Sequence, residues 1–213
     1  MPLLQFGLIA FTSIFVLVDP IAAVPTFLAM TGGATRQQRR HMAGRAAWTC
    51  FLVLLTFSFA GTYIFQLFGI TLAAFKIAGG LILGLIGLEM LRAQRSATKE
   101  TPGETEEGAV KEDVGIIPLG IPMLAGPGAI SSVMVLMSQN ADWLHAAVIV
   151  CAITVVAAVS FLVLAAADWV SSHLHETGIR ILTRMMGLLL TAIAVQFVLN
   201  GLKDVGLVRF VPL

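Results

Sequence analysis

Long apolar runs, separated by short polar stretches, make up most of this chain. A bilayer core of about 30 Å needs roughly 20 apolar residues in a helix, and six runs reach that length. The pattern predicts an all-α polytopic membrane protein with six transmembrane helices. The predicted spans are residues 3–30, 46–68, 72–91, 114–137, 144–170 and 181–202.

Basic residues gather in three of the polar stretches between these runs. The stretches are residues 31–45, 92–113 and 171–180, whereas the connections near Gly69 and Asn140 hold no Lys or Arg. Loops on the cytoplasmic side of a membrane carry an excess of Lys and Arg. We therefore predict that the three basic stretches face the cytoplasm and that both termini lie on the non-cytoplasmic side.

The first run contains two prolines and an aspartate. As one straight helix, residues 3–30 would exceed the thickness of the hydrocarbon core. Pro20 has no N–H to donate, and it pushes the residue before it, Asp19, away from helical angles. We expect the helix to break at Asp19, with Asp19 as the N-cap and Pro20 as the first residue of a second half-helix that contains Pro25.

The fourth run is interrupted more openly, because glycines and prolines recur between Gly115 and Gly128. Irregular backbone at membrane depth survives only where it is buried in protein or lines a wet cavity. We expect a break after Gly126 and a second half-helix that starts at Pro127.

The two halves of the chain show a weak internal repeat. The dipeptide that begins at Asp19 aligns with the one that begins at Gly126, and Lys76 aligns with Arg184. The two offsets agree within one residue. Two independent matches at nearly one offset indicate a duplication.

Each copy holds three spans, an odd number, so the copies must be inverted relative to each other in the membrane. Many secondary transporters have this architecture. Helix lengths from each break to the end of its span put both breaks near the midplane. We predict a single membrane domain over residues 1–213, with repeat 1 at 1–91, a cytoplasmic linker at 92–113 and repeat 2 at 114–213.

The two breaks offer different groups to a solute. A half-helix N-terminus presents N–H donors and a positive dipole end, which suit a carboxylate, and the hydroxyls of Ser131 and Ser132 add donors near Pro127. At the other break Asp19 is an anion, and an ionisable group within a span indicates function. A small zwitterion such as an amino acid fits this pattern. The predicted substrate-binding residues are Asp19, Pro20, Pro25, Gly126, Pro127, Gly128, Ser131 and Ser132.

A purely structural interpretation stands beside this one. Asp19 can be only a helix cap that packs against Lys76 or Arg184, and these two long basic side chains can extend to the interface. Thr191 and Gln196 can line a cavity or bond between helices. We keep Lys76, Arg184, Thr191 and Gln196 as candidates for ion coupling or for supporting the site.

Composition narrows the class of protein. Charged residues make up 12% of the chain and apolar residues 58%, with a mean hydropathy of +0.93, whereas soluble domains average roughly 25% charged. A net charge of +1 provides no basic surface for nucleic acid.

Cys50 and Cys151 form no metal-binding spacing. No nucleophile with a base and an orienting group is visible, so we expect no enzyme, and no cofactor or metal beyond a coupling ion, H⁺ or Na⁺.

At these same positions the chain resembles the MarC family, which is described as six-span neutral amino acid transporters. The resemblance implies a bacterial or archaeal inner-membrane protein that transports small neutral amino acids such as glycine or alanine, and it extends distantly to exporters of the LysE type. The matching stretches are Asp19-Pro20-Ile-Ala-Ala-Val-Pro25-Thr-Phe27, Phe75-Lys76-Ile-Ala-Gly79-Gly80, Pro118-Leu-Gly-Ile-Pro122-Met-Leu-Ala-Gly126-Pro127-Gly128-Ala-Ile-Ser131, and Arg184-Met-Met-Gly187 through Ala194-Val-Gln196.

Two kinds of function follow. The first is a secondary transporter of small neutral amino acids, an exporter or an importer, in which Asp19 accepts the coupling H⁺ or Na⁺. The alternative is a transporter of another small solute or ion, or a membrane protein with no transport role. The expected partners are the lipid bilayer, a small-molecule solute and further copies of the chain in an oligomer.

Overall fold

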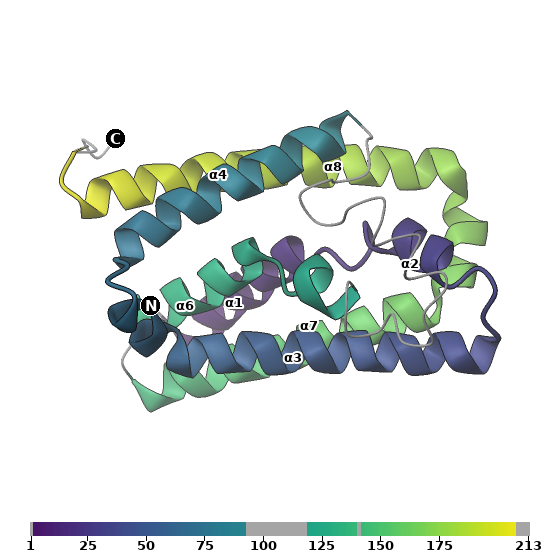
Figure 1. Ribbon diagram of the computed structural model, residues 1–213, viewed down its shortest axis with the longest axis horizontal. Helices are drawn as coiled ribbons and strands as arrows, with labels where there is room; N and C mark the ends of the chain where they lie inside the picture. Colours follow the sequence, from purple (N-terminus) through teal and green to yellow (C-terminus); the bar gives the residue numbers. More distant parts are fainter. Residues whose placement is uncertain (1, 93–118, 140–141, 208–213) are drawn as a thin grey trace.

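Helices account for nearly all of the chain that the computed structural model describes, which is residues 2–92, 119–139 and 142–207 (Figure 1). The all-α prediction is confirmed over these ranges. The elements are α1 (Leu3–Val18), α2 (Val24–Met30), α3 (Arg36–Leu67), α4 (Leu72–Leu91), the π-helical turn η1 (Leu119–Leu124), α6 (Pro127–Gln139), α7 (Trp143–Ala165) and α8 (Ala167–Asp204).

Four helices in the described part of the chain are long and apolar enough to cross a membrane, judged by length and composition. They are α3, α4, α7 and the part of α8 from Arg180 to Asp204. The shorter apolar helices α1 and α6 belong to the two predicted broken spans. The predicted linker beyond Arg92 and the start of the fourth span, residues 93–118, lie outside the described residues.

The helices run lengthwise between two ends of one bundle (Figure 1). The start of α1, the α3–α4 connection, the start of α7 and the end of α8 gather at one end. The α2–α3 connection and the α7–α8 junction lie at the other end. Both interruptions, between α1 and α2 and between η1 and α6, fall in the middle of the bundle.

Helices α4 and α8 form the most extensive pair in the structure. A Cβ atom added to Gly87 would lie 2.9 Å from the carbonyl oxygen of Gly187, and one added to Gly187 would lie 2.8 Å from that of Gly87. Nearer the start of α4, a Cβ on Gly80 would lie 2.8 Å from the carbonyl oxygen of Ala194. The helices are therefore antiparallel, and small residues let their backbones approach closely, as is typical in membranes.

Helix α3 begins well before the apolar run that predicted it. Its N-cap is Thr35, whose hydroxyl accepts a hydrogen bond from the backbone N–H of Gln38 at 3.3 Å, while the Gln38 side chain accepts from the backbone N–H of Thr35 at 2.8 Å. This reciprocal capping box starts the helix at Arg36. The polar stretch between the first two spans is thus largely helical, because local capping and not hydropathy decides where the helix starts.

The boundary between the last two predicted spans also differs from the structure. Helix α7 ends at Ala165, short of residue 170, and α8 starts at Ala167. Helix α8 then continues through the polar stretch 171–180 and turns across the end of the bundle before it runs back along α4 (Figure 1). Hydropathy marks where the chain leaves the apolar layer, whereas a polar segment can keep its backbone hydrogen bonds as a helix in water.

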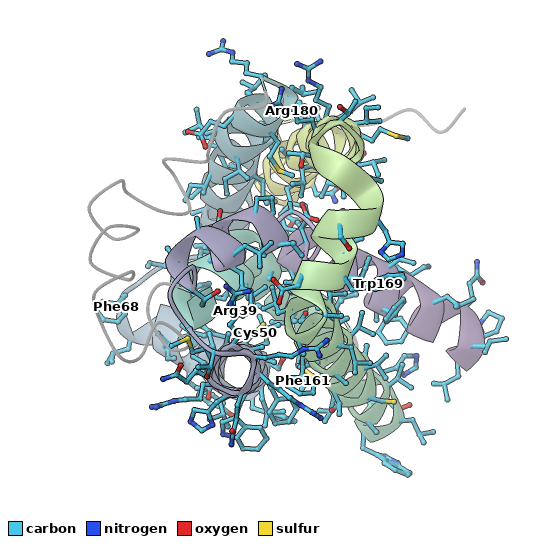
Figure 2. The ribbon with its side chains drawn as sticks, turned by 90° about the vertical axis from the view of Figure 1, so that its right-hand side faces the viewer. Arg39, Cys50, Phe68, Phe161, Trp169 and Arg180 are labelled. Carbon is cyan, nitrogen blue, oxygen red and sulfur yellow. The ribbon has the colours of Figure 1, made fainter. Side chains whose placement is uncertain are left out.

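Arg39 joins three helices at this end of the bundle, which faces the viewer in Figure 2. Its Nη1 atom lies 2.6 Å from Oδ1 of Asp168 at the start of α8. Its Nε atom donates to the carbonyl oxygen of Thr31, at the end of α2, at 3.0 Å. The guanidinium group thereby satisfies an open carbonyl at a helix C-terminus, where a cation is favoured.

The packing of α4 on α8 gives a test with a matched pair of glycines. In Gly87→Ala the new methyl group would overlap the backbone of α8 at Gly187, whereas in Gly84→Ala it would make ordinary contact with Ala194 at 3.7 Å. We expect Gly87→Ala to lower the free energy of unfolding by about 1–3 kcal/mol, as overpacking does. Gly84→Ala should leave it unchanged or raise it slightly, because alanine favours helix. Equilibrium unfolding in mixed detergent micelles measures both, and equal stability of the two variants would contradict the close packing.

Candidate functional site

The first break is made by Asp19, which ends α1. Its backbone is left-handed, with φ 46° and ψ 63°, and its N–H donates to the carbonyl oxygen of Phe15 at 2.9 Å. Asp19 alone, among the non-glycine residues that the structure describes, has a positive φ. Proline after it disfavours the right-handed helical region, and aspartate is one of the few residues that tolerate the left-handed one. Backbone strain of this kind clusters at functional sites.

The predicted cap at this break is wrong in detail. Asp19 is the C-cap of α1 and not the N-cap of the next helix, which starts at Val24 with Ala23 as its N-cap and Pro25 in its first turn. Pro20 lies in the turn between them. The carboxylate bends back over this turn, because Oδ1 of Asp19 accepts a hydrogen bond from the N–H of Ala22 at 3.3 Å. With its residue only 3% exposed, the carboxyl group lies inside the bundle.

The second break follows the prediction closely. The π-helical turn η1 closes with a hydrogen bond from the N–H of Ala125 to the carbonyl oxygen of Gly120 at 3.1 Å. Helix α6 then starts at Pro127, and the carbonyl oxygen of Gly126 accepts from the N–H of Ile130 at 3.1 Å. Proline suits the first position of a helix, because the N–H that it lacks would have no partner there.

Helix α4 covers the first two turns of α6. A Cβ atom on Gly128 would overlap the side chain of Leu83, and a Cβ atom on Gly79 would lie 2.5 Å from Oγ of Ser131. Ser131 is fully buried, and Ser132 beside it is 4% exposed. The two glycines therefore let the serine-bearing turn of α6 press against α4.

The hydroxyl of Ser131 has no hydrogen-bond partner within the described part of the chain. Leaving a buried polar group unsatisfied costs about 1–3 kcal/mol. Native proteins hold few such groups, and each one calls for an explanation such as a ligand or an ion. Ser131 lies in the second turn of a broken helix, close to the free N–H groups of its first turn. This combination forms the candidate site.

The four residues predicted to support the site lie on α4 and α8. Lys76 is buried, and its Nζ atom lies 2.6 Å from Oδ2 of Asp204 at the end of α8. Thr191 donates to the carbonyl oxygen of Gly187 at 2.8 Å and faces Gly87 across the α4–α8 contact.

Arg184 and Gln196 are exposed on α8. Gln196 donates to the side chain of Asn200 at 2.9 Å. Sequence reasoning missed Asp204, although an acidic residue at the end of the last span is a natural partner for a lysine at the start of the antiparallel third span.

The two broken helices and the helices that cover them lie in one region that includes nearly the whole chain and matches a single family model. Residues 4–205 match the model of the MarC family integral membrane protein. The chain belongs to the MarC family. It is an integral multi-pass membrane protein, and its relatives occur in both bacteria and archaea.

Three relatives show how much of the chain the similarity covers. A UPF0056 membrane protein of Methanocaldococcus jannaschii is 40% identical over 200 residues, which cover 94% of this chain and 97% of that protein. The UPF0056 membrane protein YvbG of Bacillus subtilis is 37% identical, over 91% and 92% of the two chains. YhcE of Escherichia coli is 34% identical, over 92% and 91%. No solved structure matches this MarC-family chain.

The Lys76–Asp204 pair gives an asymmetric prediction. In Asp204→Asn the buried ammonium of Lys76 loses its partner, whereas in Lys76→Met the remaining carboxylate, with its side chain 42% exposed, keeps contact with water. We expect Asp204→Asn to lower the free energy of unfolding by about 1–3 kcal/mol. Lys76→Met should lower the free energy of unfolding by less, and the double variant should be as stable as Lys76→Met. Unfolding in mixed micelles provides the measurement, and a larger loss in Lys76→Met would contradict the assignment of Lys76 as the buried partner.

Proposed function

We propose that this MarC-family protein is a secondary transporter of small neutral amino acids, of the glycine and alanine class, coupled to H⁺ or Na⁺. The observation that carries the proposal is the buried hydroxyl of Ser131, which has no partner among the described residues, in a helix that starts in the middle of the bundle. A half-helix N-terminus with an added hydroxyl donor is chemically suited to a carboxylate.

In this proposal the substrate carboxylate binds at the start of α6. The N–H groups of Gly128 and Ala129 lie in the first turn and have no partner within the helix, and Ser131 and Ser132 supply hydroxyls. Gly126 and Pro127 set the direction of these donors by starting the helix there. A carboxylate would satisfy Ser131 and complement the positive end of the helix dipole.

The substrate ammonium, or the coupling ion, is assigned to Asp19. Its carboxyl group is buried at the end of α1, and α1 packs directly against α6. The turn that contains Pro20, between α1 and the helix α2 in which Pro25 lies, leaves backbone carbonyls outside regular helix, and such carbonyls coordinate cations in transporters with broken helices. A solute with an anionic group alone would gain nothing from Asp19, which favours an amino acid over an inorganic anion or a small organic acid.

We further propose that the chain consists of two inverted repeats that make up six spans, with both termini on the non-cytoplasmic side of the plasma membrane. Three features support this proposal. Each half starts with an interrupted helix, α4 and α8 are antiparallel, and α4 packs on α6 as α8 packs on α2. An inverted pair places its site where the two halves meet, which suits alternating access.

Ser131→Ala tests the carboxylate site, with Ser138→Ala as a matched control. Ser138 lies on the same helix but is exposed, and its hydroxyl donates to the carbonyl oxygen of Val135 at 3.0 Å. Counterflow of labelled alanine and glycine into proteoliposomes should show a KM raised by roughly tenfold or more in Ser131→Ala, as expected for the loss of a hydrogen bond to a charged group. Ser138→Ala should match the wild type. No counterflow of any amino acid in the wild type would overturn the proposed function.

Asp19→Asn tests the role of the carboxyl group. We expect this variant to keep its fold, because the amide oxygen can still accept the hydrogen bond from Ala22. It should lose the dependence of amino acid flux on an imposed H⁺ or Na⁺ gradient. Flux driven by both gradients in the same assay measures this, and a variant with unchanged coupling would remove Asp19 from the mechanism while leaving transport in place.

A further inference from the structure

One face of α4 covers the start of α6, and two positions of α4 make that cover. Gly79 and Leu83 lie about one helical turn apart and share this face. A Cβ atom on Gly79 would lie 2.5 Å from Oγ of Ser131. A Cβ atom on Gly128 would lie 2.8 Å from Cγ of Leu83. A glycine on each helix therefore faces a side chain on the other, so Ser131 packs on the backbone of α4 and Leu83 packs on the backbone of α6.

Leu83 lies against the first turn of α6, where the donors of the candidate site are. Gly128 is the second residue of α6, and its N–H group is one of those that have no partner within a helix. Leu83 is only 2% exposed, and its side chain fills the space that any side chain on Gly128 would need. The wall of the candidate site at this point is thus a branched aliphatic side chain in contact with backbone.

The packing of α4 on α8 holds Leu83 in its position. Gly80 and Gly87 lie on either side of Leu83 along α4. A Cβ atom on Gly80 would lie 2.8 Å from the carbonyl oxygen of Ala194, and one on Gly87 would lie 2.9 Å from that of Gly187. Leu83 is therefore carried by a helix segment that is packed tightly on both sides of it. A side chain that selects solutes by size must be held on a rigid element in this way.

We propose that Leu83 sets the upper limit on the size of the substrate side chain. This inference rests on the proposed function, because it takes the substrate carboxylate to bind at the start of α6. The Cα atom of an amino acid is bonded directly to its carboxylate carbon, so the substrate side chain starts beside these donors and beside Leu83. Glycine and alanine present a hydrogen atom or a methyl group there. Valine and leucine would overlap the methyl groups of Leu83, and overpacking of this kind is unfavourable.

Leu83→Ala is the direct test. The substitution removes the same carbon atoms by which leucine exceeds alanine, so a larger substrate should fit the space that it leaves. Counterflow of labelled leucine and alanine into proteoliposomes gives a kcat/KM for each substrate. The ratio of the two values does not depend on how much of the variant is folded, because the amount of active protein cancels. We expect the ratio of leucine to alanine to rise by about tenfold or more, as added methylene groups are worth in a hydrophobic pocket.

Leu83→Phe tests the same wall in the opposite direction. The larger ring should exclude the methyl group of alanine more than it excludes glycine. We expect the ratio of alanine to glycine in the same assay to fall by about tenfold.

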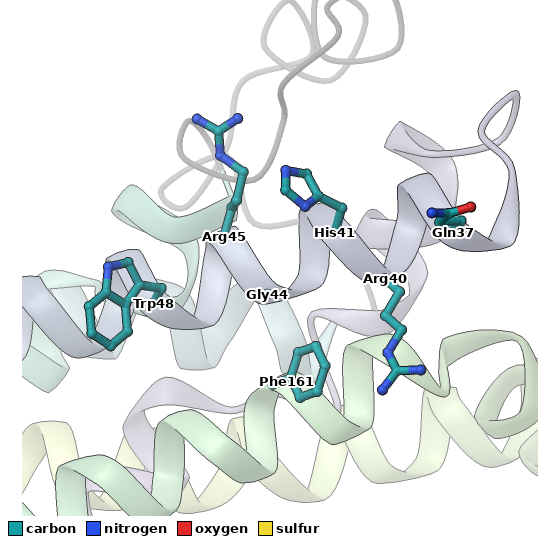
Figure 3. Close-up of a pocket in the computed structure, with 7 residues that line it drawn as sticks. All are labelled: Gln37, Arg40, His41, Gly44, Arg45, Trp48 and Phe161. Carbon is teal, nitrogen blue, oxygen red and sulfur yellow. The ribbon is translucent and has the colours of Figure 1, made fainter.

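Two control variants add space elsewhere in the molecule. Leu164→Ala removes a leucine that is 1% exposed near the end of α7. Phe161→Ala widens a groove of about 490 Å³ that is lined by α3 and by Phe161 of α7, beside Gly44 (Figure 3). Both variants should keep the wild-type ratios, because neither adds space at the start of α6.

The outcomes separate this inference from the proposed function. No counterflow of any amino acid in the wild type would overturn both. Counterflow of alanine and glycine in the wild type, with an unchanged ratio of leucine to alanine in Leu83→Ala, would overturn the role of Leu83 and leave the transporter in place. An equal rise in Leu164→Ala or Phe161→Ala would also overturn that role, because general loosening would then explain the change. A rise in Leu83→Ala alone, with the opposite shift in Leu83→Phe, supports it.

Discussion

Every backbone N–H and carbonyl group at membrane depth needs a hydrogen-bond partner inside the protein, because lipid offers none. In the part of the chain that the structure describes, helices are interrupted twice in the middle of the bundle, so the rest of the structure must cover those interruptions. Leu17, Val18 and Val24 around the first break are at most 3% exposed, and Leu124 and Ala125 at the second are at most 1% exposed. The long helices thus enclose the two interruptions, so that the irregular backbone is buried in protein and does not face lipid. The buried polar groups of Asp19 and Ser131 are a consequence of the same arrangement.

The close pairing of α4 with α8 is the clearest example of such packing between the long helices. Gly87 and Gly187 bring the two backbones together, and that contact fixes the position of α4 relative to the rest of the bundle. The adjacent part of the surface of α4 then presents Gly79 and Leu83 to α6. The environment of Ser131 therefore depends on glycines more than forty residues away in sequence. A change in the α4–α8 contact should therefore alter the packing around the candidate site, even though no residue of that contact belongs to the site.

Ion pairs connect α8 to the first half of the chain near both of its ends. Arg39 pairs with Asp168 where α8 starts, and Lys76 pairs with Asp204 where it ends. Arg39 and Asp168 are both partly exposed, and surface pairs of this kind contribute little stability, roughly 0–1 kcal/mol. Lys76 is buried, so the loss of its partner Asp204 costs more. Both pairs help to set the register of α8, because they fix its two ends against α3 and α4.

The sequence by itself determined the helical class, the apolar runs and the places where two of them break. These features are local, since proline and glycine restrict or release the backbone at their own positions, and the start of α6 at Pro127 followed from this alone. The start of α3 and the continuity of α8 did not follow from hydropathy, which reports where a chain meets water and not where its hydrogen bonds end. Only the tertiary structure decided that Lys76 pairs with Asp204 and that Ser131 lies buried against Gly79. Those outcomes depend on contacts between residues that are far apart in sequence, and no local pattern along the chain encodes which distant helix will supply the neighbour.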